Sequence, residues 1–293
     1  MADSTAYVLL VLSAAFMGSN IVFGRAAADV VPPIALAFWR WVVAAMLLLP
    51  FCAAGLLRHR AELLHHWRRL FALGALGMAI CGTFVYIGLR ETTAMNGGLI
   101  YAASPVMILI LGAAFKGERI TLRQIAGIVL ALLGVVTILT RGNLQAVLAL
   151  SFNRGDLWIL GATASWAVYS VMLRYASLRM PVMPLFAAIA VAGVIVLVPF
   201  WLIETLAVEA MPLSWSAVFS IVGVAVFASV LAFSTYQQGI RIVGSNRGGP
   251  FMYLMPVFAA LMAVVFLGES LEVYHVLGFA MVVPGVAAAT LRY

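Results

Sequence analysis

Charged residues are scarce in this chain. Asp, Glu, Lys and Arg make up only 9% of its 293 residues, whereas 65% are hydrophobic. A soluble domain carries about a quarter charged residues, so this composition is too apolar to cover a surface that faces water. Lipid needs no polar coat, and helices satisfy their own backbone polar groups there. The shortage of charge therefore excludes an ordinary soluble domain and predicts an all-α integral membrane protein that contacts the lipid bilayer.

Residues that form catalytic or metal sites are also few. Cys52 and Cys81 both lie in apolar runs, where isolated cysteines behave as small buried hydrophobes. His59, His65 and His66 share one charged loop, and no Asp or Glu lies deep in an apolar run. We therefore expect no buried carboxylate, no catalytic residues, no metal and no cofactor. The same absence disfavours an intramembrane enzyme and a proton-coupled antiporter of lipophilic cations.

Large clusters of basic residues are missing too, although the net charge is +7. A nucleic-acid-binding face needs grouped Lys and Arg, whereas here they lie singly or in small groups between apolar runs. That spacing is typical of the loops of membrane proteins, and we expect no nucleic-acid partner. The first residues, Met1–Ser4, carry no basic segment, so the first apolar run is expected to be a retained helix.

Long apolar runs are abundant. A membrane-spanning helix needs about twenty apolar residues, and such runs lie at roughly 5–25, 34–57, 70–90, 95–115, 122–140, 156–174, 182–203, 213–240, 247–267 and 273–291. Lys and Arg collect in cytoplasmic loops. If the N-terminus is cytoplasmic, only Arg25, Arg90, Arg141 and Arg154 lie on the far side. We therefore predict ten transmembrane helices with both termini in the cytoplasm.

The chain also repeats itself. One constant shift carries Gly88 onto Gly239, Glu118 onto Glu269, Gly127 onto Gly278 and Gly134 onto Gly285, and a shift two residues shorter carries Arg25 onto Arg174. Five spans per copy is an odd number, so the second copy must enter the membrane upside down. Related loops agree, because the basic loop of residues 58–69 corresponds to one with Glu204, Glu209 and no cation. We predict two inverted five-helix repeats, 1–145 and 150–293, with a site between them.

The repeated segment resembles a known family. Residues 94–98, Pro105-Val106 and Gly117-Glu118-Arg119, with the matching stretch 245–285, are similar to the EamA-type domain of the drug/metabolite transporter superfamily. Within it, the chain looks most like the aromatic amino-acid exporters of the YddG type. The resemblance implies ten helices, a central cavity, alternating access, and export of small metabolites across a bacterial inner (plasma) membrane. The second copy departs at Gly268-Glu269-Ser270, where no cation follows the Glu.

The resemblance leaves the solute open. An amino acid with an aromatic or other bulky neutral side chain is the first hypothesis, and another drug or metabolite class is the alternative. Small residues allow close helix packing, and prolines remove a backbone donor. Six residues are therefore candidates for either ordinary packing or a hinge: Gly97, Gly98, Pro105, Gly248, Gly249 and Pro256.

Candidate cavity residues are polar or aromatic and lie in mid-span: Asn20, Arg40, Tyr86, Tyr101, Trp166, Tyr169 and Gln237. The two amides would be costly against lipid, so they face protein or water, either in an interhelical hydrogen bond or at the site. The aromatic residues serve either in packing and interfacial belts or in the cavity. Arg40 either reaches outward to the interface or faces the cavity and meets a carboxylate. In the second copy, Val191 stands at the position that corresponds to Arg40, so any role of Arg40 is asymmetric.

Overall fold

The computed structural model describes residues 2–28, 30–92, 94–117, 120–143, 145, 153–175, 180–212, 214–267 and 270–290. Within these ranges the chain forms helices and connecting turns and no strand. The elements before residue 145 are α1 (Ala2–Ala28), α2 (Pro33–Arg58), α3 (Arg60–His65), α4 (Trp67–Leu73), the π-helical segment η1 (Gly74–Ile80), α5 (Cys81–Glu91), α6 (Ala94–Tyr101), α7 (Ser104–Lys116) and α8 (Leu122–Leu139). Glu118 and Glu269 lie outside the described residues.

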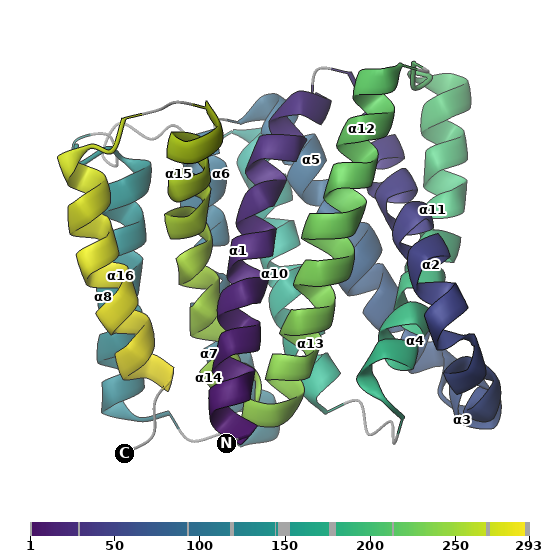
Figure 1. Ribbon diagram of the computed structural model, residues 1–293, viewed down its shortest axis with the longest axis horizontal. Helices are drawn as coiled ribbons and strands as arrows, with labels where there is room; N and C mark the ends of the chain where they lie inside the picture. The colour runs from purple at the N-terminus through teal and green to yellow at the C-terminus, as the bar shows by residue number, and fades with distance from the viewer. Residues whose placement is uncertain are drawn as a thin grey trace.

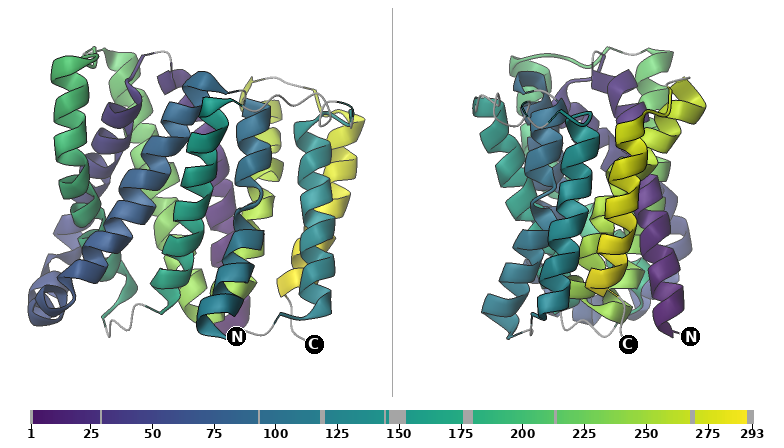
Figure 2. Two further views of the ribbon diagram at one scale, coloured as in Figure 1. Left: turned by 180° about the vertical axis from the view of Figure 1, so that it is seen from behind. Right: turned by 90° about the vertical axis from the view of Figure 1, so that its left-hand side faces the viewer.

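The later elements form a similar series. They are α10 (Arg154–Arg174), α11 (Val182–Ala207), α12 (Trp215–Gly223), the π-helical segment η2 (Val224–Leu231), α13 (Ala232–Val243), α14 (Ser245–Gly248), the 3-10 segment η3 (Gly249–Tyr253), α15 (Leu254–Leu267) and α16 (Val273–Thr290). The helices stand side by side in one bundle (Figures 1 and 2). Eight continuous helical stretches of the described chain are long and apolar enough to cross a membrane. The predicted class, an all-α multi-pass membrane protein, is confirmed.

Polar caps mark where several of these helices begin. At the start of α8, Thr121 Oγ1 accepts a hydrogen bond from Gln124 N at 3.2 Å, and Gln124 Oε1 accepts one from Thr121 N at 3.0 Å. Asn153 and Asp156 form the same reciprocal pair at the start of α10. Each such cap satisfies a backbone N–H that has no partner inside the helix and contributes about 1 kcal/mol.

Glycines bring α8 and α16 into backbone contact. A Cβ on Gly127 would lie 2.6 Å from the Gly285 carbonyl oxygen, and a Cβ on Gly285 would lie 2.7 Å from the Gly127 oxygen. Further along, a Cβ on Gly134 would lie 2.7 Å from the Gly278 oxygen. Because the earlier residue of α8 meets the later residue of α16, these two helices run antiparallel. Only a residue without a side chain allows this approach.

The same kind of contact occurs at two other helix pairs. In α5, a Cβ on Gly88 would lie 2.8 Å from the Gly155 carbonyl oxygen of α10. In α13, a Cβ on Gly239 would lie 3.3 Å from the Ala6 oxygen of α1. The shifts found in the sequence carry Gly88 onto Gly239 and Ala6 onto Gly155. Equivalent glycines therefore contact equivalent helices.

Helices α2 and α11 also run antiparallel. Near the end of α11, Glu204 accepts hydrogen bonds from the first backbone amides of α2, Ile34 N at 3.0 Å and Ala35 N at 2.6 Å. At the opposite end of the pair, a Cβ on Gly55 would lie 2.5 Å from Cγ of Pro184. The carboxylate thus satisfies orphan amides at the start of α2, where the helix dipole favours negative charge.

Irregular turns interrupt helices at matching places in the two halves. The π-helical segments η1 and η2 occupy equivalent positions, and the turn at 102–103 between α6 and α7 is equivalent to the end of η3. A π-helical turn displaces carbonyls from the regular ladder, so other donors must satisfy them. In η1, Ser165 Oγ donates to Leu76 O at 2.8 Å and Trp41 Nε1 donates to Met78 O at 3.0 Å. These bonds tie η1 to α10 and α2.

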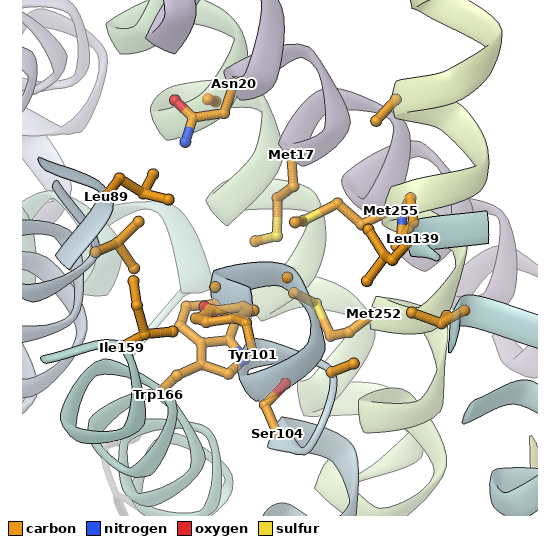
Figure 3. A pocket seen from close by; sticks show the side chains of 18 of the residues that line it. Met17, Asn20, Leu89, Tyr101, Ser104, Leu139, Ile159, Trp166, Met252 and Met255 are labelled. Atoms are coloured by element: carbon orange, nitrogen blue, oxygen red, sulfur yellow. The ribbon is translucent and has the colours of Figure 1, made fainter. Parts of the chain in front are cut away.

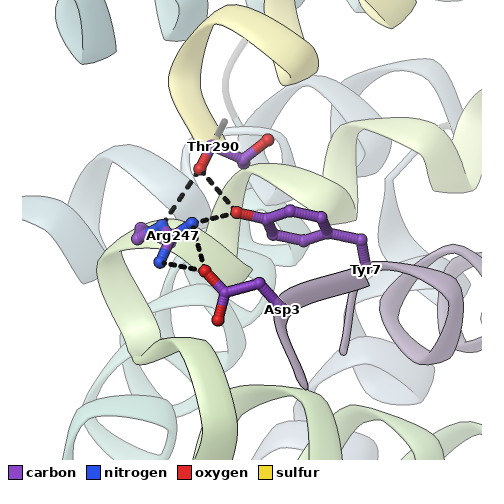
Figure 4. A network of polar contacts seen from close by, with 4 residues as sticks. All are labelled: Asp3, Tyr7, Arg247 and Thr290. Carbon is purple, nitrogen blue, oxygen red and sulfur yellow. Dashed lines mark hydrogen bonds and ion pairs between the residues drawn. The ribbon is translucent and has the colours of Figure 1, made fainter. Parts of the chain in front are cut away.

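One end of the bundle is fastened by an arginine. Arg247 donates through Nε to the carbonyl oxygen of Thr290 at 3.0 Å, and through both terminal nitrogens to Asp3 Oδ2 at 3.3 Å. It also donates to the hydroxyl of Tyr7 (Figure 4). This network joins α1, α14 and α16 and lies at the end where α1 begins and α16 ends.

Candidate functional site

A cavity of about 760 Å³ lies between residues of the two halves. Its outer wall includes Arg90 at the end of α5, Arg141 after α8, and His275 at the start of α16. Its inner part reaches Trp166, in the middle of α10, and Ser104 (Figure 3). The cavity therefore runs from the end of the bundle opposite the Arg247 network to about mid-bundle. None of the four residues of that network is among its lining residues.

Aromatic rings form the inner floor of the cavity. The Trp166 ring packs edge-on against Phe233, with centroids 5.4 Å apart, and lies 5.0 Å from the Tyr236 ring. The Tyr101 ring lies beside Trp166 in Figure 3, and its hydroxyl is 3.6 Å from Sγ of Cys81. A broad apolar and aromatic surface of this kind suits an apolar or ring-shaped part of a ligand.

Arg40 faces the cavity rather than the lipid interface. The residue is only 6% exposed and is among the cavity's lining residues. Its Nε donates to Ser229 Oγ at 3.0 Å, and Nη1 donates to the Tyr86 hydroxyl at 2.8 Å. The Tyr86 hydroxyl in turn donates to Asn20 Oδ1 at 3.5 Å. In the part of the chain that is described, no carboxylate pairs with Arg40, so that half of the hypothesis is not met.

Five of the predicted residues, Asn20, Arg40, Tyr86, Tyr101 and Trp166, are thereby brought together along one cavity. The other two, Tyr169 and Gln237, are not among its lining residues. They bond to each other, with Gln237 Nε2 donating to the Tyr169 hydroxyl at 3.0 Å, and both are almost fully buried. This is the interhelical hydrogen bond considered from the sequence, and it joins α10 to α13 beneath the floor.

The candidate hinge residues divide in the same way. Gly97, Gly98, Pro105 and Pro256 line the cavity, whereas Gly248 and Gly249 do not. A Cβ on Gly248 would lie 2.4 Å from Cδ1 of Ile240, so this glycine serves close packing. Both prolines lie in the first turn of a helix, in α7 and α15, where a missing N–H breaks no helical bond. They therefore mark the restart of each interrupted helix.

The expectation that no carboxylate is buried was wrong. Asp156 is 2% exposed and Glu204 is 5% exposed. Asp156 accepts from Asn153 N at 2.9 Å and from Thr92 Oγ1 at 2.5 Å, and Glu204 caps α2. Both carboxylates lie near helix ends and serve backbone amides that have no helical partner. Neither is among the residues that line the cavity.

Some polar residues in the cavity wall or directly behind it were not identified from the sequence. Ser229 holds Arg40, and the hydroxyls of Ser104 and Tyr253 are buried without a hydrogen-bond partner among the described residues. Ser229 Oγ donates to Val224 O, five residues back, because it lies in the π-helical segment η2. Ser104 and Tyr253 lie next to the helix interruptions that the repeat shift makes equivalent, and this position could have pointed to them.

Comparisons with known proteins find similar sequences over nearly the whole chain. The model of the EamA-like transporter family matches twice, over residues 4–140 and 153–291. An uncharacterized transporter of Bacillus subtilis (strain 168), YyaM, is 26% identical over 97% of this chain and 93% of its own. An uncharacterized transporter of Archaeoglobus fulgidus is 26% identical over 99% of both chains.

A solved crystal structure supports the fold. It superposes with a TM-score of 0.78 at 23% sequence identity, and it covers 98% of this chain and 96% of the other. The two matches to the family model together span nearly all of the sequence in which the helices and the cavity lie. The chain belongs to the EamA-like transporter family.

Proposed function

We propose that this membrane protein exports small organic metabolites, in the first place amino acids with aromatic or other bulky neutral side chains, by alternating access through the central cavity. The observation that carries the proposal is the cavity itself. Its volume of about 760 Å³ falls within the range of small-molecule sites, about 300–1,000 Å³. It reaches one end of the bundle and stops at aromatic rings, while Arg247 fastens the other end.

The proposed architecture is ten spans in two inverted repeats. Besides the eight long apolar helices, α1 and the segment α14–η3–α15 run alongside them in Figures 1 and 2. Helices that the repeat makes equivalent, α2 with α11 and α8 with α16, pack antiparallel. A pseudo-two-fold axis in the membrane plane makes equivalent helices run antiparallel. Such an axis would allow the two ends of the cavity to open in turn.

The proposed orientation places both termini in the cytoplasm of a bacterial cell, because the basic loops lie on that side. The cavity described here then faces outward. Single cysteines provide the test, because an impermeant thiol reagent added to intact cells should modify a cysteine at Glu209 and spare one at Arg60. The reverse pattern would overturn the orientation.

The residues that line the cavity support the part of this proposal that rests on likeness to aromatic amino-acid exporters of the YddG type. Tyr101 and Trp166 offer ring faces at mid-bundle, and Met17, Met252 and Met255 surround them with adaptable apolar side chains (Figure 3). A well-placed pair of rings contributes about 0.5–1.5 kcal/mol beyond the burial of area. The floor therefore favours solutes with a large apolar or aromatic side chain over small polar ones.

Counterflow in proteoliposomes tests the proposed transport. Vesicles loaded with unlabelled tryptophan, phenylalanine or leucine should accumulate the labelled amino acid without a pH gradient, and empty vesicles should not. The variant Tyr101→Ala should lower the rate for aromatic solutes while its abundance in the membrane stays unchanged. Counterflow of other metabolites, but of no amino acid, would replace the proposed substrate class.

A further inference from the structure

The guanidinium of Arg40 is a buried cation that has no anionic partner among the described residues. Its hydrogen-bond acceptors among the described residues are two neutral hydroxyls, those of Ser229 and Tyr86. The rings of Trp41 and Tyr86 lie 4.9 Å and 5.9 Å from its Cζ, which adds weak cation–π attraction. Removing a charge from water is costly unless an opposite charge compensates it. The resting site therefore lacks the group that would stabilise it best.

The neighbours of Arg40 hold it in place and leave part of it unused. Ser229 Oγ accepts a hydrogen bond from Nε, and the Tyr86 hydroxyl accepts one from Nη1. No described residue accepts from Nη2. A guanidinium offers planar pairs of N–H groups that match a carboxylate in two parallel bonds. Because Ser229 is itself fixed by Val224 and Tyr86 by Asn20, the fork is pre-organised for an incoming anion.

Free space adjoins this fork. Gly82 of α5 lines the cavity, and a Cβ added there would have Nη1 of Arg40, at 3.9 Å, as its one close neighbour. A side chain at position 82 would occupy the volume next to the guanidinium. Most helical glycines of this protein, by contrast, would place a Cβ closer than 3.4 Å to another atom. Gly82 therefore leaves room where an anion would sit.

The charge of the cavity wall also favours an anionic ligand. Its lining residues include three arginines, Arg40, Arg90 and Arg141, and no Asp or Glu. Arg90 is partly neutralised by Glu209 at the exposed mouth, 3.3 Å away, whereas Arg40 lies deep inside. A cavity with low-dielectric walls and one sign of charge concentrates ligands of the opposite sign. An ammonium group, however, meets no carboxylate among the lining residues.

We propose that Arg40 binds the carboxylate of the transported solute and that the solute's amino group is dispensable. The ligand class is an amphipathic carboxylate, with its anionic head at Arg40 and its apolar body on the aromatic floor. This inference rests on the proposed transport function and narrows it. A deaminated acid should bind at least as well as the amino acid with the same side chain, and an amine without the carboxylate should not.

Equilibrium binding to the purified protein, measured by calorimetry in detergent, avoids the leak of weak acids and amines through vesicles. The indole set is tryptophan, indole-3-propionate and tryptamine, and the aliphatic set is leucine, 4-methylpentanoate and isopentylamine. In each set we expect the amine to bind about tenfold to a hundredfold more weakly than the acid, as for loss of a hydrogen bond to a charged group. Amine binding equal to acid binding, or no binding of any acid, would overturn the proposal.

Variants of the wall assign the effect to Arg40. Arg40→Leu should abolish the preference for the acid over the amine, and Arg40→Lys should keep part of it because the charge remains. Gly82→Leu should weaken acid binding while every bond of Arg40 is retained, so it tests the site even where Arg40→Leu fails to fold. The matched control is Arg58→Leu, an exposed arginine at the end of the same helix, which should leave the preference unchanged.

The two sets separate this inference from the proposed function. Binding of the aliphatic acids without the indole acids would remove the aromatic preference and leave the role of Arg40 intact. Equal binding of amines, with amino-acid counterflow preserved, would refute the carboxylate site and leave amino-acid export standing. A preference for acids that survives both Arg40→Leu and Gly82→Leu would locate the anion elsewhere and refute the assignment.

Discussion

The two halves of the molecule share their packing and differ in their chemistry. Gly88 and Gly239 meet equivalent helices, and the π-helical segments η1 and η2 occupy equivalent places. Yet Arg40 in α2 corresponds to Val191 in α11, which does not line the cavity. Backbone contacts are thus similar in the two halves, whereas the buried arginine of the cavity occurs in one of them.

Energetics explain why the charge is not duplicated. A second guanidinium buried beside Arg40 would be desolvated and repelled by the first, with no described carboxylate in the cavity wall to offset it. A duplicated glycine contact carries no such penalty, because each copy gains the same close approach of two helix backbones. The comparison therefore predicts that variants of the glycine contacts affect stability in both halves, while variants of the cavity affect function on one side.

The largest effect is expected at the contact between α8 and α16. Gly127→Ala and Gly285→Ala would each place a methyl group within 2.6–2.7 Å of backbone atoms of the other helix. Overpacking of this kind costs about 1–3 kcal/mol, and two rigid backbones leave little room for relaxation. Both variants should lower the midpoint of thermal unfolding in detergent by similar amounts.

The control for this pair is Val129→Leu, on the exposed face of the same helix. It should leave the unfolding midpoint within error of the wild type. A loss of stability confined to Gly127→Ala, with Gly285→Ala tolerated, would contradict the close backbone contact that these two glycines make between α8 and α16.

The sequence predicted the all-α membrane class because that class depends on local signals, and the two inverted repeats stay a prediction from periodic ones. Hydropathy identifies a helix in lipid without knowledge of its neighbours, and matched glycines reveal a repeat without coordinates. It did not separate Tyr169 and Gln237 from the cavity, because periodicity gives the face of a helix and not the helix that covers it. The buried carboxylates were missed for the same reason, since Glu204 is covered by α2 from far away in the chain.

The next largest effect is expected where the two ends of the bundle differ. Arg247 binds Asp3, Tyr7 and the Thr290 carbonyl at one end, and no comparable network closes the described part of the cavity mouth. Asp3 is about half exposed, so its ion pair with Arg247 contributes little, whereas hydrogen bonds from a charged group to buried acceptors contribute about 1.5–3 kcal/mol each. Arg247→Gln should therefore shift the protein toward states in which this end is open.

Two single cysteines in a protein without Cys52 and Cys81 report that shift. A cysteine at Ser245, fully buried beside Arg247, should become several times more reactive in Arg247→Gln, and a cysteine at Leu139 on the cavity wall should become less reactive. Parallel increases at both positions would indicate general loosening rather than a change of access, and would contradict the proposed role of the network.

A smaller effect is expected from Glu204, whose carboxylate caps α2. Glu204→Gln keeps one oxygen acceptor and loses the negative charge at the helix start, which is worth about 0.3–1 kcal/mol. Glu204→Ala loses both bonds and should cost about 1–2 kcal/mol. Unfolding midpoints should fall in that order. Counterflow by Glu204→Gln should continue, because a group outside the cavity wall does not bind the solute, and its loss would assign Glu204 to transport.

The smallest effect is expected at the cavity mouth, where Arg90 and Glu209 form an ion pair at 3.3 Å with both side chains about half exposed. Exposed pairs contribute about 0–1 kcal/mol, so Glu209→Gln should leave the unfolding midpoint unchanged. The substitution nevertheless removes the negative charge that offsets Arg90 at the cavity mouth. The lining residues, which include three arginines and no Asp or Glu, then present a stronger positive potential to an anion. The association rate of an anionic ligand should rise at low salt and return to the wild-type value at high salt, since screening reaches about 10 Å at 0.1 M. Stopped-flow binding of indole-3-propionate measures both rates. A stability loss well above about 1 kcal/mol would show that this pair holds its end of the bundle together, and would overturn the contrast between the two ends.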